Sequence, residues 1–407
     1  AIKHRGPDEF GYHIDKDICL GNRRLSIIDL GGGKQPIYNE DGSIVIVYHG
    51  EIYNFKEVRE DLEKKGHKFS TNTDTEVLVH CYEEYGQDIL QKVNGMFAFA
   101  IWDKTRQELF LARDRYGIKP LYYTFIGNYF LFASEQKAII THPAFNREID
   151  LEALLEYFTF QNIFTDKTLL KGFKLIPSGC YAQLPLGLGT NGSHTLKMTR
   201  YWDFNFSEPE NPAAEEEYIE ELDRLFRQAV NRQLVSDVEL GAYLSGGMDS
   251  GSITAIAATQ LPYIKTFTCG FDLHSATGLE LGFDEREKAE YMSYLFKTEH
   301  YAMVLKAGDM ERILPRIAWH LEEPRVGQSY PNFYVAQLAG KFVKVVLAGT
   351  GGDELFGGYP WRYYRAVVNA DFEQYIDKYY LYWQRLIPNK IIHEVFKPIW
   401  SEVQHVW

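Results

Sequence analysis

Short hydrophobic runs separated by polar turns fill most of the first 190 residues. They have the length and the β-branched or aromatic content of strands. The polar turn at 103–106 joins two of them into a hairpin, and Gly127 with Asn128 joins two more. Consecutive hairpins predict antiparallel sheets. The runs lie at 43–48 (SIVIVY), 96–102 (MFAFAIW), 108–113 (ELFLAR), 120–125 and 129–133.

Two helices are predicted between the first strands. Asn54 can cap a helix over 55–65 that Gly66 ends, and Thr73 or Asp74 can cap a second helix over 75–85 that Gly86 ends. Helices on the outer faces of antiparallel sheets define an α+β domain, which we place at residues 1–190.

The pattern changes after a stretch with little periodicity at 191–212, which we predict to be a linker. An acidic amphipathic helix follows over 213–234. Hydrophobic strands then alternate with helices, which predicts an α/β domain over 213–407 with a doubly wound parallel sheet and ligands at the carboxyl ends of its strands. The strands lie at 240–244, 265–269 and 343–347, and the helices begin at 250, 284 and 353.

Composition and charge narrow the function. The formal net charge is -13 and no basic run is present, which argues against nucleic-acid binding. The four cysteines are scattered without zinc-like spacing, as in a cytoplasmic protein with free thiols. No signal peptide and no hydrophobic run of about 18 residues is visible, so we expect no membrane partner.

The strongest local motif is LSGGMDS, which begins at Leu244 between a strand and a helix. Two glycines allow the backbone to approach a phosphate, and the helix N-terminus directs N–H groups towards it. Asp249 would repel a bare phosphate and is expected to bind Mg²⁺. An ordinary glycine-rich turn is the alternative, which the following Asp249 and Ser250 make less attractive.

A second motif, GTGGDELFGGY, begins at Gly349 after the strand at 343–347. It again places glycines and carboxylates at the carboxyl end of a strand. Asp353 is a candidate second metal ligand facing Asp249. The alternative is a glycine-rich loop with a helix-capping aspartate.

Together these motifs resemble the synthetase domain of glutamine-dependent asparagine synthetases, an ATP-pyrophosphatase domain. The first half resembles the same family's class II glutaminase, an N-terminal-nucleophile hydrolase. The matching segments keep the family's order and cover essentially the whole chain. They are HRGPD from His4, NRRLSIID from Asn22, GEIYN from Gly50, TDTE from Thr73, GMFAFA from Gly95 and ARDRYGIKPLYY from Ala112.

The resemblance implies that glutamine is hydrolysed in one domain, and that ATP adenylates an aspartate-like carboxylate for amidation in the other. ATP and Mg²⁺ are the implied cofactors, glutamine, ATP and aspartate or another carboxylate are the small-molecule substrates, and a homodimer is compatible with the family. The implied glutamine-binding residues are Arg24, Ile27, Ile28, Gly50, Glu51 and Asp74. Those for ATP are Tyr243, Leu244, Ser245, Gly246, Gly247, Asp249, Ser250, Phe271, Ala348 and Gly349, and those for Mg²⁺ are Asp249 and Asp353.

Physical reasoning supports the implied glutamine site. The Arg24 guanidinium can form a bidentate pair with the α-carboxylate of glutamine. Glu51 and Asp74 can pair with its α-ammonium group.

At three positions the sequence departs from the family pattern, and each departure bears on whether the chain has the family's activity. The family's N-terminal Cys precedes the HRGPD segment by a few tens of residues, so we expect this chain to lack its first segment and, at the other end, part of its last domain. His49 replaces an Asn that donates to the oxyanion, a donor worth about 100- to 1,000-fold in rate. Thr350 replaces a carboxylate, and Thr is no general base near neutral pH.

These departures keep other functions open. Glu322, Glu323 or Glu354 could replace the carboxylate that Thr350 lacks. Alternatively, a relative could amidate a larger acid, such as a sugar acid or a secondary metabolite, which an aromatic and basic cluster at 359–364 could hold. A third hypothesis is a catalytically weak regulator that only binds nucleotide.

Overall fold

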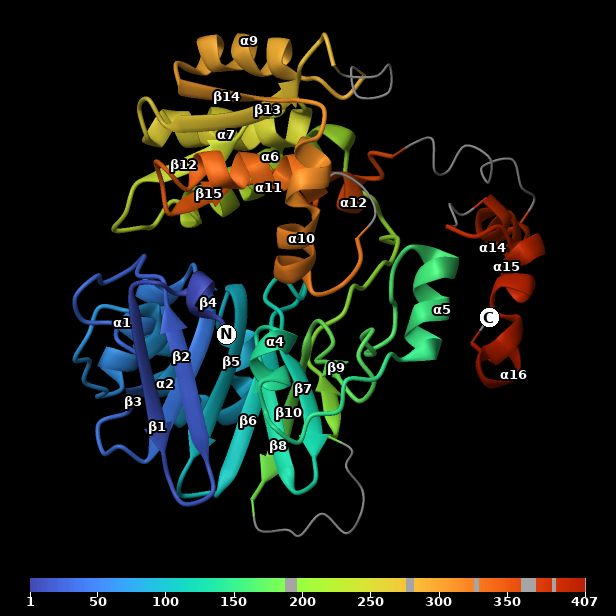
Figure 1. Cartoon of the computed structure of the whole chain (residues 1–407). Helices are drawn as coiled ribbons and strands as arrows, with labels where there is room; N and C mark the ends of the chain where they lie inside the picture. The colour runs from blue at the N-terminus through green and yellow to red at the C-terminus, as the bar shows by residue number, and fades with distance from the viewer. Residues whose placement is uncertain (187–195, 276–281, 326–328, 360–370, 383–385, 407) are drawn as a thin grey trace. The chain divides into compact units, whose positions relative to one another are not determined.

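The computed structural model describes residues 1–186, 196–275, 282–325, 329–359, 371–382 and 386–406. The chain forms two compact units (Figure 1). The first comprises residues 1–148, 166–225 and 235–237, and the second comprises 149–165, 226–234 and 238–407. Residues 191–195 of the predicted linker and residues 360–364 of the aromatic cluster lie outside the described residues.

Antiparallel sheets dominate the first unit, as predicted. A six-stranded sheet has the order β11-β10-β6-β5-β4-β3, beside a three-stranded sheet, β8-β7-β9, and a β1-β2 pair. The strands are β1 (Glu9–Ile14), β2 (Cys19–Arg24), β3 (Ile37–Tyr38), β4 (Ile44–Ile52), β5 (Gly95–Asp103), β6 (Glu108–Arg113), β7 (Tyr122–Ile126), β8 (Tyr129–Ala133), β9 (Lys174–Leu175), β10 (Cys180–Pro185) and β11 (Met198–Arg200).

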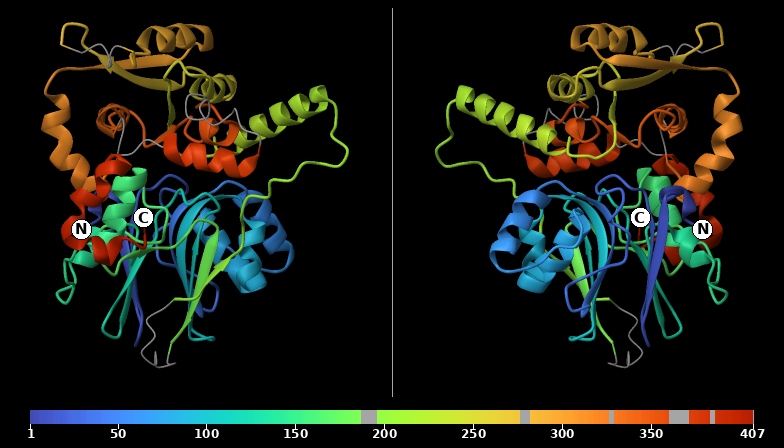
Figure 2. Two further views of the ribbon diagram at one scale, coloured as in Figure 1. Left: turned by 90° about the vertical axis from the view of Figure 1, so that its right-hand side faces the viewer. Right: turned by 90° about the vertical axis from the view of Figure 1, so that its left-hand side faces the viewer.

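Alternating side chains of β4 enter two different cores. Ile44 and Ile46 pack in a core with α1 (Phe55–Lys64) and α2 (Asp74–Tyr85), whereas Val45 and Val47 pack on the opposite face. The two side views in Figure 2 show α1 and α2 (blue) on one side of the six-stranded sheet. The other described helices of this unit are short: η1 (Lys3–Arg5), η2 (Gly86–Asp88), α3 (Ile89–Lys92) and α4 (Gln136–Ile140).

Both predicted helices of the first unit are confirmed, but one predicted cap is wrong. The Thr73 hydroxyl accepts a hydrogen bond from the Glu76 N–H at 3.2 Å and so caps α2. Asn54 makes no such bond at the start of α1. Its side chain instead binds the backbone at Lys92 and Asn94 and ties the helix start to the segment before β5.

The second unit contains the predicted parallel sheet, with a fourth strand that the sequence pattern did not show. The strand order is β14-β13-β12-β15. The two strands that follow β12 in the chain lie on one side of it and β15 lies on the other, so the strand order reverses between β12 and β15. Val230 and Ile256 pack on one face, and Val335 and Ala339 on the other. The elements are α6 (Glu215–Arg232), β12 (Leu240–Tyr243), α7 (Met248–Gln260), β13 (Lys265–Phe271), α9 (Arg286–Phe296), β14 (Glu299–Leu305), α10 (Asp309–Leu321), α11 (Ser329–Ala339), β15 (Val345–Leu347) and α12 (Gly352–Phe356).

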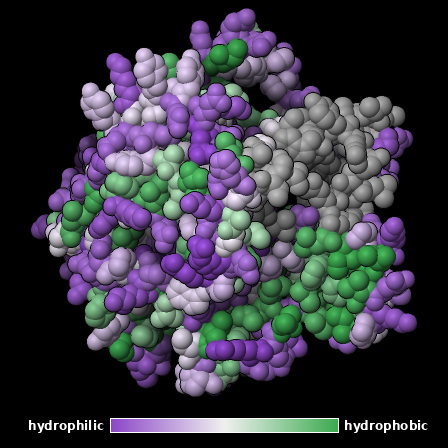
Figure 3. Space-filling view, turned by 45° about the horizontal axis from the view of Figure 1, so that its top comes forward, coloured by the Kyte–Doolittle hydropathy of each residue, from purple (hydrophilic) through white to green (hydrophobic). Residues whose placement is uncertain are grey.

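One helix inside the first half of the chain, α5 (Leu151–Phe160), packs with the C-terminal helices of the second unit. Leu155 shares a buried cluster with Ile392, Phe396 and Val403. In Figure 3, hydrophobic side chains gather on the right, the side on which Figure 1 places α5 and these helices. The C-terminal elements are α14 (Phe372–Tyr382), α15 (Asn389–Val395), η3 (Lys397–Ile399) and α16 (Trp400–Val403).

Among the residues that the structure describes, no helix has both the length and the apolar character needed to cross a membrane.

Candidate functional site

A buried carboxylate, that of Asp74, and a half-buried one, that of Glu51, lie where β4 meets the start of α2. Asp74, only 6% exposed, accepts hydrogen bonds from the Tyr48 hydroxyl at 2.8 Å and the Ile52 N–H at 3.0 Å. Both donors belong to β4, the strand that carries Glu51. The first turn of α2 is therefore fixed against Glu51, and the structure brings together two of the predicted glutamine-binding residues.

Both carboxyls of this pair have raised pKa values, although the charges of Lys119 and Arg24 partly oppose the shift of Glu51. Burial, followed by the charge of Asp74, raises the pKa of Glu51 to about 8. Burial also raises the pKa of Asp74. A positively charged group bound between the two carboxylates would stabilise their ionised forms.

His49 precedes this pair on β4, and its ring is held in one tautomer. Burial, followed by the charges of Lys119 and Arg5, lowers the pKa of His49 well below its usual value, so the ring is neutral at pH 7. Its Nε2 lies 3.2 Å from Arg5 Nη2. Because a guanidinium can only donate, Nε2 accepts and Nδ1 carries the proton. Nδ1 is buried and has no hydrogen-bond partner within the described part of the chain.

Arg24 is already engaged by the protein. Its guanidinium donates to Glu9 at 2.7 Å and to the Ile28 and Asp29 carbonyls, each at 2.8 Å. The Ile27 carbonyl accepts from the Asp237 N–H at 3.0 Å. A bidentate pair between Arg24 and a bound carboxylate would therefore replace its contact with Glu9.

The structure adds charged residues that sequence reasoning missed. Arg5 donates to Glu135 at 2.8 Å, and Glu135 also pairs with His4 and Lys137. Burial, followed by the charge of Arg5, lowers the pKa of Lys119, and Glu51 partly opposes this shift. Arg5 lies in the HRGPD segment and Lys119 in the ARDRYGIKPLYY segment. No local sequence pattern shows that the charges of both lower the pKa of His49.

In the second unit, the loop after β12 is a compact turn. The Ser245 hydroxyl lies 3.0 Å from the Ser250 hydroxyl and accepts from the Gly247 N–H at 3.2 Å. Gly246 has a φ of 80° and packs against Lys288 of α9, a cation that the sequence pattern did not suggest. Helix α7 begins at Met248, two residues before the predicted start, so Asp249 lies in its first turn. The N–H groups of that turn have no intrahelical acceptor.

The two glycine-rich loops meet because β12 and β15 are neighbours. A Cβ at Gly352 would lie 2.3 Å from Asp249 Oδ2, and one at Gly349 would lie 2.7 Å from the Ser250 backbone nitrogen. The Asp353 carboxylate instead lies against Gly358, where a Cβ would approach its Oδ1 to 1.8 Å. The two predicted metal ligands thus both follow the carboxyl ends of neighbouring strands, β12 and β15. The Asp353 carboxylate, however, points to its own turn.

Four more of the predicted residues lie in different environments. Thr350 and Ala348 are exposed. Glu354 accepts from the Gly351 N–H and the Tyr359 hydroxyl, each at 3.0 Å, so it stabilises its own loop. Phe271 ends β13. Its N–H donates to Asp284, and its carbonyl accepts from Arg286, which leaves one carbonyl lone pair for a ligand.

Two family models match the chain. Residues 1–202 match a glutamine amidotransferase domain, and residues 221–404 match asparagine synthase.

Curated relatives match most of the chain. It is 39% identical over 359 residues to asparagine synthetase [glutamine-hydrolyzing] 1 of Bacillus subtilis, which covers 88% of this chain and 54% of that protein. It is 36% identical over 384 residues to putative asparagine synthetase [glutamine-hydrolyzing] 2 of Methanocaldococcus jannaschii, covering 88% and 71%. The chain thus spans about half of the first relative and about seven tenths of the second.

Among solved structures, a likeness is found to the allosteric regulatory enzyme of purine biosynthesis. It has a TM-score of 0.34 and 18% identity, and covers 61% of this chain and 50% of that one.

The raised pKa of Glu51 generates a prediction about stability. Between its ordinary pKa of 4.5 and about 8, the folded protein retains a proton that the unfolded chain releases, so stability falls as pH rises. We expect Glu51→Gln, without ligand, to raise the melting temperature at pH 8, by about 2 to 4 °C for each kcal/mol of relieved charge. At pH 4 the two proteins should melt alike.

The matched control is Glu60→Gln on α1, which removes an exposed carboxylate. Calorimetric melting at both pH values measures the difference. A lower melting temperature for Glu51→Gln at pH 8 would show that Glu51 is already neutralised within the protein.

Proposed function

Because this chain belongs to the asparagine synthetase family, we propose that it serves as a glutamine-dependent, ATP-driven amidotransferase of an aspartate-like carboxylate. The observation that carries this proposal is the meeting of two glycine-rich loops beside Asp249 at the β12–β15 junction. A doubly wound sheet binds its ligand where the strand order reverses. We place the enzyme in the cytoplasm, and a homodimer is part of the proposal.

In the first unit, the proposed ligand is glutamine. Its α-ammonium group would supply the positive charge that Glu51 and Asp74 lack. Its α-carboxylate would take the place of Glu9 on Arg24. The Nδ1–H of His49 would then donate to the oxyanion that forms when the side-chain amide is attacked.

In the second unit, the proposed ligand is ATP. The loop at 245–250 would bind the pyrophosphate through backbone N–H groups, with Lys288 nearby to offset its charge. The hydroxyls of Ser245 and Ser250 and the carboxylate of Asp249 are hard oxygen donors of the kind that Mg²⁺ prefers, and Gly352 leaves room for that carboxylate. Bound there, Mg²⁺ would neutralise charge on the phosphates.

In the proposed reaction, ATP is needed to activate the carboxylate before amidation. A carboxylate is a poor electrophile, whereas its acyl-adenylate reacts readily with ammonia and releases AMP. The exposed Thr350 cannot accept a proton from the attacking ammonia. Thr350 therefore supports a second candidate function, the amidation of a larger acid.

A prediction about the ATP site concerns Asp249. Asp249→Asn in the natural full-length protein should lower ATP–pyrophosphate exchange at least about 100-fold, because the metal-binding charge is lost. Asp377→Asn, at an exposed position on α14, is the matched control and should exchange normally. Exchange at the native rate in Asp249→Asn, with an unchanged melting temperature, would contradict the assignment.

A prediction about the glutamine site concerns His49. In the full-length protein, His49→Phe should lower the kcat of glutamine hydrolysis about 100- to 1,000-fold, because it removes the Nδ1–H donor. His49→Asn should match or exceed the native rate. Glutamate release at saturating glutamine measures both. If the Phe variant turned over as fast as the native enzyme, the ring would have no oxyanion role.

A prediction about the carboxylate acceptor concerns Thr350. Thr350→Glu should raise aspartate-dependent AMP release by about 100-fold, a usual contribution of a general base. Thr350→Gln has the same length without the charge and should gain nothing. Equal rates in the native protein and both variants would remove Thr350 as a marker of altered chemistry.

A further inference from the structure

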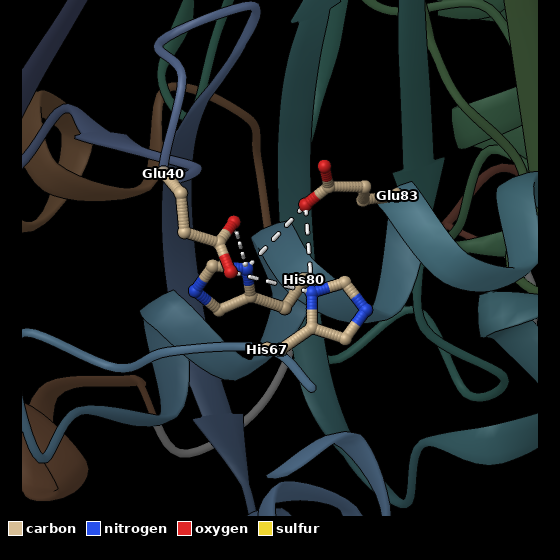
Figure 4. Close-up of side chains that lie close together, drawn as sticks. All are labelled: Glu40, His67, His80 and Glu83. Carbon is tan, nitrogen blue, oxygen red and sulfur yellow. Dashed lines mark ion pairs between the residues drawn. The ribbon is translucent and has the colours of Figure 1, made fainter. Parts of the chain in front are cut away.

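Two histidines and two glutamates that the amidotransferase chemistry does not use converge in the first unit. His80 and Glu83 lie on α2, one turn apart. Glu40 follows β3, and His67 lies in the connection between α1 and α2. Figure 4 shows both imidazole rings and both carboxylates directed towards a common centre.

The spacing of these four groups matches a tetrahedral metal site. His67 Nδ1 lies 3.6 Å from Glu40 Oε1 and 3.7 Å from Glu83 Oε2. His80 Nδ1 lies 3.2 Å from Glu40 Oε2 and 3.5 Å from Glu83 Oε2. One ligand atom from each of the four lies within 4.8 Å of the others. Metal–ligand bonds of about 2.0–2.1 Å place tetrahedral ligands about 3.3 Å apart, so only small side-chain movements would close the site.

The outward-facing ring nitrogens complete the pattern. Nε2 of His67 lies 3.5 Å from Glu84, and Nε2 of His80 lies 3.7 Å from Glu76. Metal-bound histidines usually direct their second nitrogen to a carboxylate, which keeps the proton there and leaves the other lone pair for the metal. The two glutamate ligands are also oriented, because Glu40 accepts from the Lys68 N–H at 2.9 Å and Glu83 from the Asn39 amide at 3.1 Å.

His80 argues against a purely hydrogen-bonded cluster. Its side chain is 1% exposed, and neither ring nitrogen makes a hydrogen bond of ordinary geometry to any described residue. Buried polar groups normally form hydrogen bonds, whereas this ring has only ion-pair contacts, to Glu40, Glu76 and Glu83, at 3.2 to 3.7 Å. A cation at the centre would bond to Nδ1 directly and would also balance the carboxylates of Glu40 and Glu83, which lie 3.2 and 3.5 Å from that nitrogen.

We propose that Glu40, His67, His80 and Glu83 form a binding site for a divalent transition metal, with Zn²⁺ as the best fit. Imidazole and carboxylate ligands suit Zn²⁺, and four protein ligands leave no open position, which is typical of a structural site. The metal would join α2 to the turn before β4. Asp74 begins that helix, so the metal would hold the element that carries a proposed glutamine ligand.

The test is Zn²⁺ titration of the full-length protein after removal of metals with a chelator. We expect one tightly bound Zn²⁺ per chain at this site and a higher melting temperature when it binds. Co²⁺ in place of Zn²⁺ should give the intense visible absorption of a four-coordinate site. His67→Gln, at a partly exposed position, should weaken Zn²⁺ binding at least about 100-fold and abolish the Co²⁺ signal.

Three control variants show whether Zn²⁺ binding belongs to this cluster. His274→Gln and Glu60→Gln remove exposed side chains of the same types and should bind Zn²⁺ normally. Asp249→Asn removes the proposed Mg²⁺ ligand and should leave the Co²⁺ spectrum unchanged. The proposal is overturned if the stripped protein binds no Zn²⁺ at micromolar concentrations, or if His67→Gln binds it as tightly as the native protein. If the His67→Gln substitution lowered the melting temperature equally with and without Zn²⁺, the cluster would be an ion-pair network only.

Discussion

The long pairing of β4 with β5 is the contact on which the first unit depends. It runs in register from Ile44 opposite Asp103 to Ile52 opposite Gly95, and it lies between the two cores. At its site end the backbones approach so closely that a Cβ on Gly50 or on Gly95 would lie 2.2 Å from a carbonyl oxygen of the other strand. This pairing fixes the backbone of His49 and Glu51, so the positions of both groups are set by the sheet rather than by a loop.

Negative charge is the second feature of the molecule, and in the first unit the neighbouring carboxyls of Glu51 and Asp74 both have raised pKa values. The chain carries a net charge of -13, yet its buried acids are placed individually. Glu135 pairs directly with Arg5, His4 and Lys137, whereas the charges of Lys119 and Arg24 only partly offset the raised pKa of Glu51 beside Asp74. This contrast separates a structural carboxylate from one available to a ligand. It is a difference of environment, because the residue types are the same.

The sequence was sufficient for most of the fold, whereas the roles of the site residues stay predictions. Helices at 55–65 and 75–85 and the strands at 43–48 and 96–102 have strong periodic patterns, so α1, α2, β4 and β5 were predictable. The strand β14 was missed, as was the role of Asn54, whose bonds to residues about 40 positions away no local pattern reveals. For the same reason the tautomer of His49, the engagement of Arg24 by Glu9 and the four-residue cluster at His80 required coordinates.

Helix α5 has a consequence for biosynthesis. Its buried residue Leu155 packs against Ile392, Phe396 and Val403, which follow it by more than 230 positions. A ribosome adds about 5–20 residues each second, so this hydrophobic surface remains without its partners for about 10 to 50 seconds after it is made. A nascent chain of this protein therefore carries the apolar surface of α5 uncovered until Ile392, Phe396 and Val403 have been made.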